Sequence, residues 1–432
     1  MKYGDVQPAV HVASAYPKVR APHPAAAPAA PQYNGCRIAS YERIAESPCR
    51  RICRVNLPAV AVSMTYSGAY MKVKSIETYD TRDVAVVRVR TDDGAEGWGQ
   101  TAPHNADITV EVLHRQIAPH VLGADPLAVE QTSERCIEAS YKFTGSYICR
   151  ALAGVDTALW DLRGRLEGKP VCRLLDGKTR ALRAYASSLR RDISPEDEAA
   201  RMLRLRDACG FTACKVRIGR RCGRDQDQWP GRTPALVAAM RKAMGDDFAI
   251  LVDANSCYTP AKAVEVGRML QDHRIVHFEE PCPWWELEWT AQVAAALEVP
   301  VAGGEQDFHL PTWRRIFDIH AVDIAQPDVC YAGGFTRALQ IARMAAFAGV
   351  PVVPHSANLS MVTVFAVHLM ACIPNAGAYV EFCIEATKWV EGFLAAPLEV
   401  RAGMINVPQE PGWGVTVNPQ WLARARRRIS EA

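Results

Sequence analysis

The sequence lacks the features that would place a protein of this size in a specialised class. Its 432 residues contain no apolar run of 18 or more, so no segment is expected to span a bilayer as a helix. The formal net charge is only +3 and is scattered along the chain, which argues against binding to nucleic acid or to a membrane surface. What remains is an ordinary globular composition, with 49% hydrophobic and 22% charged residues.

The 14 cysteines also lack the paired spacing of a metal site or of a disulfide framework. Cys49 and Cys53 are four positions apart without a second pair. Several others lie inside apolar runs, namely Cys214, Cys330, Cys372 and Cys383. In a chain this long, such cysteines are typical of reduced, buried thiols, and we therefore expect a cytoplasmic protein.

Residues 1–70 differ in composition from everything that follows. They contain an Ala/Pro-rich run at 21–31, show neither a helical nor a strand period, and have no secretory signal. We expect a disordered extension, or sequence upstream of a true start at Met71.

Residues 71–180 and residues 386–432 each have a pattern of their own. Residues 71–180 show two strands joined by a turn at 91–94, followed by helical patterns at about 108–120, 127–139 and 146–168. This predicts a small α+β domain with an antiparallel sheet. In residues 386–432, the segment 412–417 resembles a strand that returns to the N-terminal sheet, and the basic end (424–428) is expected to be a solvated helix face.

Residues 181–385 alternate short apolar runs with amphipathic helical patterns. The runs lie at 183–187, 212–218, 249–253, 275–279, 299–304, 322–326, 351–354 and 378–383. Eight strands with helices between them predict a closed (β/α) barrel. The alternative is a doubly wound sheet, which would carry a glycine-rich phosphate loop after its first strand, and the sequence has none there.

Three of the predicted strands end on a carboxylate, at Asp253, Glu279 and Glu305. Both intervals are 26 residues, the length of one strand, one helix and two short loops. This period places the carboxylates at the same end of successive parallel strands, where an apolar site would not hold three negative charges without a cation. A hard divalent ion, Mg²⁺ by default, suits such ligands. The alternative is that each acid caps the helix that follows its strand. Capping would explain a single acid, but it would not explain three acids at one regular interval.

More polar side chains follow the later strands. Asp328, His355 and Glu381 continue the series at intervals of 23, 27 and 26 residues. Because barrel active sites lie at the C-terminal ends of the strands, we expect these groups to share one mouth. His355 and Asp328 could form a dyad for proton abstraction, although a lone histidine after a strand can also be structural.

The second predicted strand carries two cations, Lys215 and Arg217, which its alternation places on one face. Two cations inside a barrel are costly unless they face carboxylates and an anionic substrate.

Together these segments resemble the mandelate racemase subgroup of the enolase superfamily, over about residues 71–420. Before the barrel, the match runs from 153–162 to 174–177. The matching barrel segments are Lys215-Val216-Arg217, Val252-Asp253-Ala254-Asn255, Phe278-Glu279-Glu280-Pro281, Gly304-Glu305, Gln326-Pro327-Asp328 with Gly333-Gly334, Pro354-His355-Ser356 and Glu381. The resemblance implies an α/β fold: a (β/α)₇β TIM-type barrel with an α+β capping domain formed by the N-terminal region and the C-terminal tail.

The resemblance also implies roles for the matched positions. Asp253, Glu279 and Glu305 would bind Mg²⁺, Glu280 would not, and Asn255 would lie beside the metal.

For the chemistry, the resemblance implies that His355 is the general base, oriented by Asp328, and that Glu381 hydrogen-bonds a carboxylate oxygen of the substrate. The reaction would be removal of the proton next to a carboxylate, with Mg²⁺ stabilising the charge that develops on its oxygens. A homo-oligomer is implied as well.

One departure from the family pattern favours a particular reaction. The family's usual second base ends a Lys-x-Lys motif, and here that position is Arg217, which stays protonated and is a poor base. Asp328, rather than a lysine, in the sixth strand points away from the cycloisomerase and dipeptide-epimerase branches. We therefore expect a hydro-lyase, an acid-sugar dehydratase that yields a 2-keto-3-deoxy acid, with Lys215 left open as a second base. The alternatives are a racemase or epimerase of a 2-hydroxy acid and a catalytically silent carboxylate-binding relative.

The wall of the substrate pocket is predicted from position alone. Trp284 and Trp285 follow the fourth strand of the barrel, and Tyr147 ends a predicted capping-domain loop. Each tryptophan could instead pack on a helix. The arginine-rich insert at 220–232 could reach the mouth and serve a diacid. The expected partner is a small carboxylate, an acid sugar.

Overall fold

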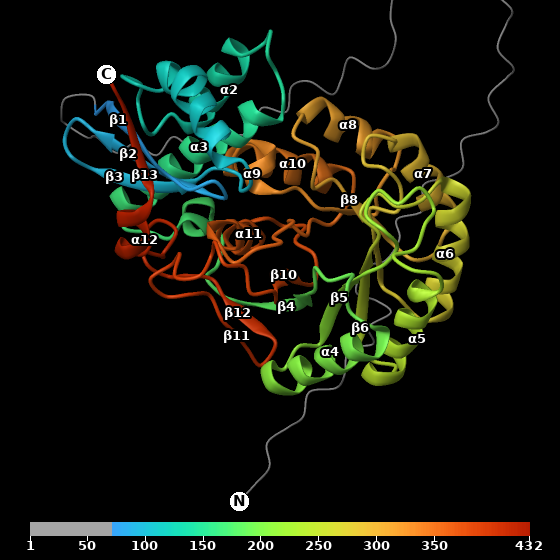
Figure 1. Ribbon diagram of the computed structural model, residues 1–432. Coiled ribbons are helices and arrows are strands. Elements are labelled where there is room, and N and C mark those ends of the chain that lie inside the picture. Colours follow the sequence, from blue (N-terminus) through green and yellow to red (C-terminus); the bar gives the residue numbers. More distant parts are fainter. Residues whose placement is uncertain (1–70) are drawn as a thin grey trace, which may run out of the picture. The chain divides into compact units, whose positions relative to one another are not determined.

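Two sheets organise the part of the chain that the computed structural model describes, residues 71–432 (Figure 1). The first sheet is antiparallel, in the order β13-β1-β2-β3. Its strands are β1 (Val73–Asp80), β2 (Ala85–Thr91), β3 (Glu96–Gln100) and β13 (Arg426–Glu431). The predicted turn at 91–94 joins β2 to β3, and its Gly94 adopts a positive φ of 92°. The predictions for residues 1–70 lie outside the described residues.

Helices pack on one face of this sheet. They are α1 (Ala106–Val112), which continues through a π-helical turn and a 3₁₀ turn to His120, and α3 (Ser146–Leu166). A third helix, α2 (Val129–Ala139), packs on α3. Two glycines in β3 bring α3 unusually close to the sheet. A Cβ at Gly97 would collide with the backbone of Ala158, and one at Gly99 would collide with the backbone of Gly154. Backbone-to-backbone packing of this kind requires glycine.

The second sheet contains the parallel strands of the barrel. In order they are β4 (Ala181–Ser187), β5 (Ala213–Arg217), β6 (Ala249–Asp253), β7 (His277–Glu279), β8 (Val301–Gly303), β9 (Ile324–Ala325) and β10 (Val380–Cys383). Each pairs in parallel with the next from β4 to β9, and β10 pairs in parallel with β4. Two short strands extend the sheet beyond β4: β12 (Met404–Asn406) pairs antiparallel with β4, and β11 (Val400–Arg401) pairs antiparallel with β12.

Single bridges complete the ring between β9 and β10. Ala325 at the end of β9 bridges Val352 in parallel, and Val352 bridges Ala376 in parallel. Ala376 leads directly into β10. The predicted strand at 351–354 is therefore present only as this bridge, while the other seven barrel strands overlap their predicted ranges. The fold is the predicted (β/α)₇β barrel with a capping domain.

Helices alternate with the barrel strands and cover their outer side (Figure 1). They are α4 (Pro195–Cys209), α5 (Arg232–Met244), α6 (Pro260–Asp272), α7 (Leu287–Ala296), α8 (Leu310–Asp318), α9 (Val329–Ala332), α10 (Phe335–Phe347) and α11 (Met361–Cys372). A short α12 (Pro419–Arg424) follows later. No helix within residues 71–432 is long and apolar enough to cross a membrane.

The C-terminal tail differs from the prediction. The segment 412–417 does not join the N-terminal sheet: Gly412 bridges Pro170 and Val417 bridges Leu394. Instead, the basic end is an edge strand, β13, and not a solvated helix. The physical reason is charge pairing across the strands, because Arg426 and Arg427 form ion pairs with Asp80 and Glu77 of β1 at 2.9 and 2.7 Å. Acidic partners on a sheet edge favour an extended strand of arginines.

Candidate active site at the mouth of the barrel

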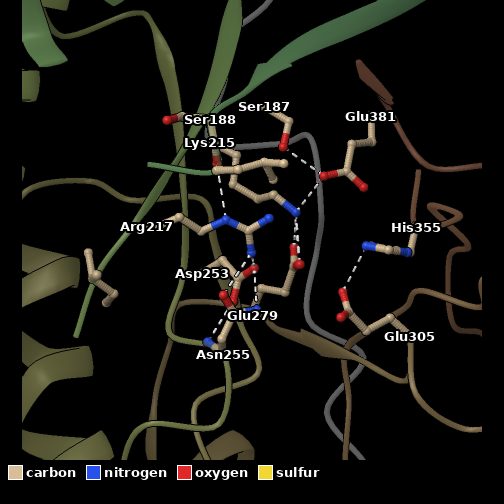
Figure 2. Close-up of polar contacts among 12 residues, drawn as sticks. Ser187, Ser188, Lys215, Arg217, Asp253, Asn255, Glu279, Glu305, His355 and Glu381 are labelled. Atoms are coloured by element: carbon tan, nitrogen blue, oxygen red, sulfur yellow. Dashed lines mark hydrogen bonds and ion pairs between the residues drawn. The ribbon is translucent and has the colours of Figure 1, made fainter. Parts of the chain in front are cut away.

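The C-terminal ends of the barrel strands bring charged side chains into one layer (Figure 2). Arg217, Asp253 and Glu279 are neighbours in the register of β5, β6 and β7. Their side chains point inward because each lies two positions after another interior residue. Glu305 follows β8, and Glu381 lies in β10. The period of the acids along the sequence therefore becomes a shared position around the mouth.

Each of the three predicted metal ligands faces a basic side chain. Asp253 forms an ion pair with Arg217, and Glu279 forms one with Lys215 at 2.7 Å. The Nε2 atom of His355 lies 3.1 Å from Glu305 Oε2 (Figure 2). All of these side chains are nearly or fully buried. Because buried charges are expensive without partners, this pairing is what allows so many carboxylates to share the site.

Lys215 lies at the centre of the charged layer with no exposed surface. Its ammonium donates to both oxygens of Glu279, at 2.8 and 2.7 Å, and lies 2.9 Å from Glu381 Oε1. Burial opposes its positive charge, yet Glu279 and Glu381 together raise the pKa of Lys215 above its ordinary value. The ammonium has three N–H groups, and these three carboxylate oxygens can accept from all of them. Lys215 is therefore enclosed below the mouth and does not point into it.

Glu381 is also fully engaged. Its Oε1 accepts from Ser187 Oγ at 2.7 Å, and its Oε2 accepts from the Ser356 backbone N–H at 2.7 Å. Burial would raise the pKa of Glu381, but Lys215 and His355 lower it to about 2. The carboxylate is therefore negatively charged and fixed between β4, β5 and the segment that carries His355.

His355 and Asp328 are in direct contact, as the sequence predicted. The Nδ1 atom of His355 lies 2.8 Å from Asp328 Oδ2, so Nδ1–H donates to the carboxylate and Nε2 faces the mouth. Burial would lower the pKa of His355, but Glu305, the Asp328 hydrogen bond and Glu381 raise it to about 10. Asp328 is held in turn, because its Oδ1 accepts from the backbone N–H groups of Cys330 and Tyr331 at the start of α9.

On the opposite side of the mouth, Asn255 connects two arginines to the Asp253 loop. Its amide oxygen accepts from Arg191 Nη2 at 2.8 Å and from Arg217 Nη1 at 3.2 Å. Its own amide donates to Asp253 Oδ2 at 3.0 Å, and its backbone N–H donates to Asp253 Oδ1 at 2.7 Å. Asn255 itself has a positive φ of 41°. The contacts position Asp253 from both sides.

The donor set fits a hard divalent cation. As they stand, no three His, Cys, Asp or Glu side chains of residues 71–432 are grouped to hold a metal ion. The reason is visible in the pairing above, since each carboxylate turns to a cationic side chain. Acids nevertheless remain in excess: Glu280 Oε1 is buried without a hydrogen-bond partner, and burial, Glu305 and Glu279 raise the pKa of Glu280 well above its usual range. Oxygen ligands with surplus negative charge are what Mg²⁺ requires.

The structure places the other predicted substrate contacts less centrally. Trp284 and Trp285 form an edge-to-face pair after β7, with 37% and 56% of their surface exposed. Trp284 also lines a small cavity of about 20 Å³ together with Glu280 and Asp307. Tyr147 lies in the first turn of α3. Their contact with a substrate stays a prediction.

Sequence reasoning missed several members of the site. Gln326 Nε2 donates to Glu279 Oε2 at 2.8 Å, and His277 Nε2 lies 3.1 Å from the same oxygen. Ser187 holds Glu381, and Arg191 holds Asn255. A signal existed for His277, which precedes Glu279 by two positions and so shares its face of the strand. Arg191 lies in the loop after β4, where periodicity gives no signal.

Two family descriptions match this chain and together cover more than half of it. "Mandelate racemase / muconate lactonizing enzyme, N-terminal domain" matches residues 61–176, and "Enolase C-terminal domain-like" matches residues 197–421.

Characterised relatives have similar sequences over most of their length. The chain is 30% identical to an arabinonate dehydratase from Saccharolobus solfataricus, over 78% of this chain and 88% of that protein. It is 32% identical to a D-galactarolactone cycloisomerase from Agrobacterium fabrum, over 81% of this chain and 92% of that protein.

Solved structures have the same fold. A provisionally named racemase from Roseobacter denitrificans is 54% identical, with a TM-score of 0.82 over 84% of this chain and 100% of that one. A mandelate racemase/muconate lactonizing protein from Paracoccus denitrificans, solved in complex with magnesium, is 29% identical, with a TM-score of 0.76 over 84% of this chain and 98% of that one.

Proposed function

The chain belongs to the mandelate racemase / muconate lactonizing enzyme family of the enolase superfamily, and from that premise we propose that it is a Mg²⁺-dependent acid-sugar dehydratase. The relatives support the reaction class, since several of them are named as dehydratases of arabinonate, galactonate, gluconate or galactarate. The product of such a hydro-lyase is a 2-keto-3-deoxy acid. Asp253, Glu279 and Glu305 are the residues that we propose as metal ligands.

The observation that carries the proposal is the asymmetry of the acid–base groups. His355 has one nitrogen fixed on Asp328 and the other facing the mouth. Across the barrel, the two cations of β5 are enclosed: Lys215 donates to two carboxylates, and Arg217 is ion-paired to Asp253 and donates to the Ser188 carbonyl oxygen at 3.0 Å. A racemase needs a base on each face of the α-carbon, whereas an elimination can proceed with one.

The proposed steps follow from this arrangement. A Mg²⁺ ion held by Glu305 would offset the largest of the negative charges that raise the pKa of His355. The neutral imidazole can then take, at Nε2, the proton from the carbon next to the substrate carboxylate, while Asp328 keeps the imidazole in the required tautomer. Held by Asp253, Glu279 and Glu305, Mg²⁺ would supply positive charge to the carboxylate oxygens, where the second negative charge develops. The electron pair of the broken C–H bond forms a C2–C3 double bond, and the C3–O bond breaks. The proton on Nε2 is then available to the departing hydroxyl, so one water is lost and the enol becomes the keto acid.

The proposed role of Lys215 is positioning. It holds Glu279 and Glu381 at fixed points of the mouth. The hydrogen bond from Glu381 to a substrate carboxylate oxygen, which the family resemblance implies, would require Glu381 to be protonated, because two carboxylates cannot share a hydrogen bond without a proton; this role stays a prediction.

Incubation of the full chain with Mg²⁺ and a library of mono- and dicarboxylic acid sugars in D₂O tests the proposal. Keto acid is measured by a colorimetric assay and exchange of the α-proton by NMR, with His355→Asn as the control variant. Keto acid from one sugar, abolished in the control, is the expected result.

Two outcomes would contradict the proposal. Inversion at the α-carbon with no keto acid would identify a racemase or epimerase and would require a second acid–base group at Lys215 or Arg217. Neither exchange nor keto acid with any sugar, despite measured Mg²⁺ binding, would favour a catalytically silent carboxylate-binding relative.

The compartment and assembly belong to the same proposal. All of the cysteines among residues 71–432 are free thiols, which supports a reducing, cytoplasmic environment. Family membership leads us to propose a homo-oligomer, which light scattering of the purified protein would test.

A further inference from the structure

Arg150 is a half-buried cation near the mouth that forms no ion pair within residues 71–432. It lies in the second turn of α3, on the capping-domain side. Its Nη1 donates to the Pro103 carbonyl oxygen at 3.4 Å, and its guanidinium carbon lies over the Tyr331 ring, 3.8 Å from the centroid. A guanidinium that is partly removed from water and lacks a carboxylate is a binding site for an anionic ligand.

Three other arginines near the mouth are already engaged. Arg217 is ion-paired with Asp253. Arg191 donates to the carbonyl oxygens of residues 218, 219 and 253 and to the side chain of Asn255. In the insert, Arg232 turns into the fold and donates to the Arg217 carbonyl oxygen at 2.8 Å. Arg220, Arg221 and Arg224 of the insert are exposed, so water solvates them. The insert that the sequence offered for a diacid therefore gives a weaker candidate than Arg150, which is partly removed from water.

Arg150 lies on the same side of the mouth as the base. Tyr331 belongs to α9, which lies against α3 and begins directly after Asp328 (Figure 1). The centroids of the Tyr331 and His355 rings are 6.1 Å apart. Combined with the stacking distance, this places the Arg150 guanidinium no more than about 10 Å from the imidazole.

We propose that Arg150 binds a second carboxylate at the far end of the substrate, so that the preferred substrate is a dicarboxylic acid sugar. The inference rests on the proposed function, because it takes the α-carbon to lie beside His355. From that carbon, four carbon–carbon bonds of an extended chain span about 5 Å. Hydrogen-bonding contacts of about 3 Å at each end bring the full reach to about 11 Å, so a six-carbon diacid that is not fully extended can span a separation of at most about 10 Å. Tyr331 supports one face of the guanidinium, which leaves its N–H edges available for a carboxylate.

Binding of unreactive acids tests the site without turnover. Adipate and hexanoate are six-carbon acids with two and one carboxylates, and neither carries a hydroxyl that could be eliminated. Calorimetric titration of the Mg²⁺-loaded full chain should show adipate binding at least about tenfold tighter than hexanoate, the effect of one charged hydrogen-bonded contact. The Arg150→Met variant should lose that preference. Arg163→Met is the matched control, since Arg163 also lies in α3, over the Trp160 ring at 5.6 Å, and is ion-paired with Glu167.

Turnover supplies a second readout, with a dicarboxylic and a monocarboxylic acid sugar of matched stereochemistry. Arg150→Met should lower kcat/KM for the diacid by about tenfold or more, mainly through KM, and change the monoacid by less than about threefold. Arg150→Lys keeps the positive charge, so its kcat/KM for the diacid should lie between those of the wild type and of Arg150→Met. An intermediate value would show that the loss in Arg150→Met does not come from a failure to fold.

Three results would overturn the proposal: equal affinity of the wild type for adipate and hexanoate, an equal loss for both sugars in Arg150→Met, or preferred turnover of a 6-phosphorylated monoacid. A failure of the proposed function would look different, since adipate would still be preferred while no sugar gave keto acid.

Discussion

Asp328 offers the sharpest test of how the site works, because its two oxygens do different things. One oxygen accepts from two backbone N–H groups at the start of α9, at 2.7 and 3.0 Å. The other accepts from His355 Nδ1 at 2.8 Å. In Asp328→Asn, the amide oxygen can satisfy only one of these positions. The two backbone donors require an acceptor, so the amide oxygen should stay there and the amide NH₂ should face the imidazole.

The expected consequence is the wrong tautomer of His355. A donor facing Nδ1 forces that nitrogen to accept, which moves the ring proton to Nε2, the atom that faces the mouth. A protonated Nε2 cannot take a proton from the substrate. General-base catalysis contributes about 10²- to 10⁴-fold to a rate, so kcat should fall by that factor. The midpoint of thermal unfolding should change little, because the cap of α9 is preserved.

The assay is the rate of α-proton exchange in D₂O, measured by NMR at saturating substrate, alongside thermal unfolding. Asp328→Asn in the His355→Asn background should cause no further loss, because both changes remove the same base. Asn418→Asp is a matched control, since it exchanges amide and carboxylate at the start of α12, where Asn418 accepts from the Gln420 N–H at 2.9 Å. An exchange rate in Asp328→Asn within about threefold of the wild type would refute the tautomer argument.

Three further predictions concern stability. Lys215→Met should lower the thermal midpoint by about 5 °C or more, because losing one partner of a buried charge group costs about 3–5 kcal/mol; Glu381→Gln added to it should restore part of the loss, and an unchanged midpoint would contradict the role of Lys215. Burial lowers the pKa of His368 to about 4. Below about pH 6.5 the unfolded state therefore binds a proton at this histidine while the folded state stays neutral, which favours unfolding. Stability should therefore fall by about 2 kcal/mol between pH 7 and pH 5, and a pH profile that is equally steep in His368→Gln would count against this. Gly99→Ala should destabilise by about 1–3 kcal/mol, because its methyl group would meet the backbone of α3; a chemical denaturation midpoint equal to that of the wild type would show that the sheet and helix can separate without cost.

Much of the barrel could be read from the sequence because its signals are local. Short apolar runs at a regular spacing predict buried parallel strands, and a carboxylate at the end of a run predicts its place at the C-terminal rim. The His355–Asp328 contact followed from the same reasoning, since neighbouring strands bring their ends together.

The C-terminal tail could not be read in this way. A run of arginines at 426–428 has no apolar period, so composition alone favours an exposed helix. Only the partner strand shows why the segment is extended, because β1 presents Asp80 and Glu77 at its edge. The strand at 351–354 was predicted longer than it is, since two bridges at Val352, to Ala325 and to Ala376, connect β9 to the segment before β10.

The reactive groups and their positions along the strands follow from residue order alone: three regularly spaced acids, a histidine and an aspartate, and an arginine at the position where the family has a second base. Which of these groups contact one another depends instead on how the chain folds in space. Lys215 meets Glu381 across 166 positions of chain, and Arg150 meets Tyr331 across 181, because ring closure and domain packing bring these segments together. Strand periodicity fixes a side chain's height and direction. Its partner depends on the distant segments that fold against it.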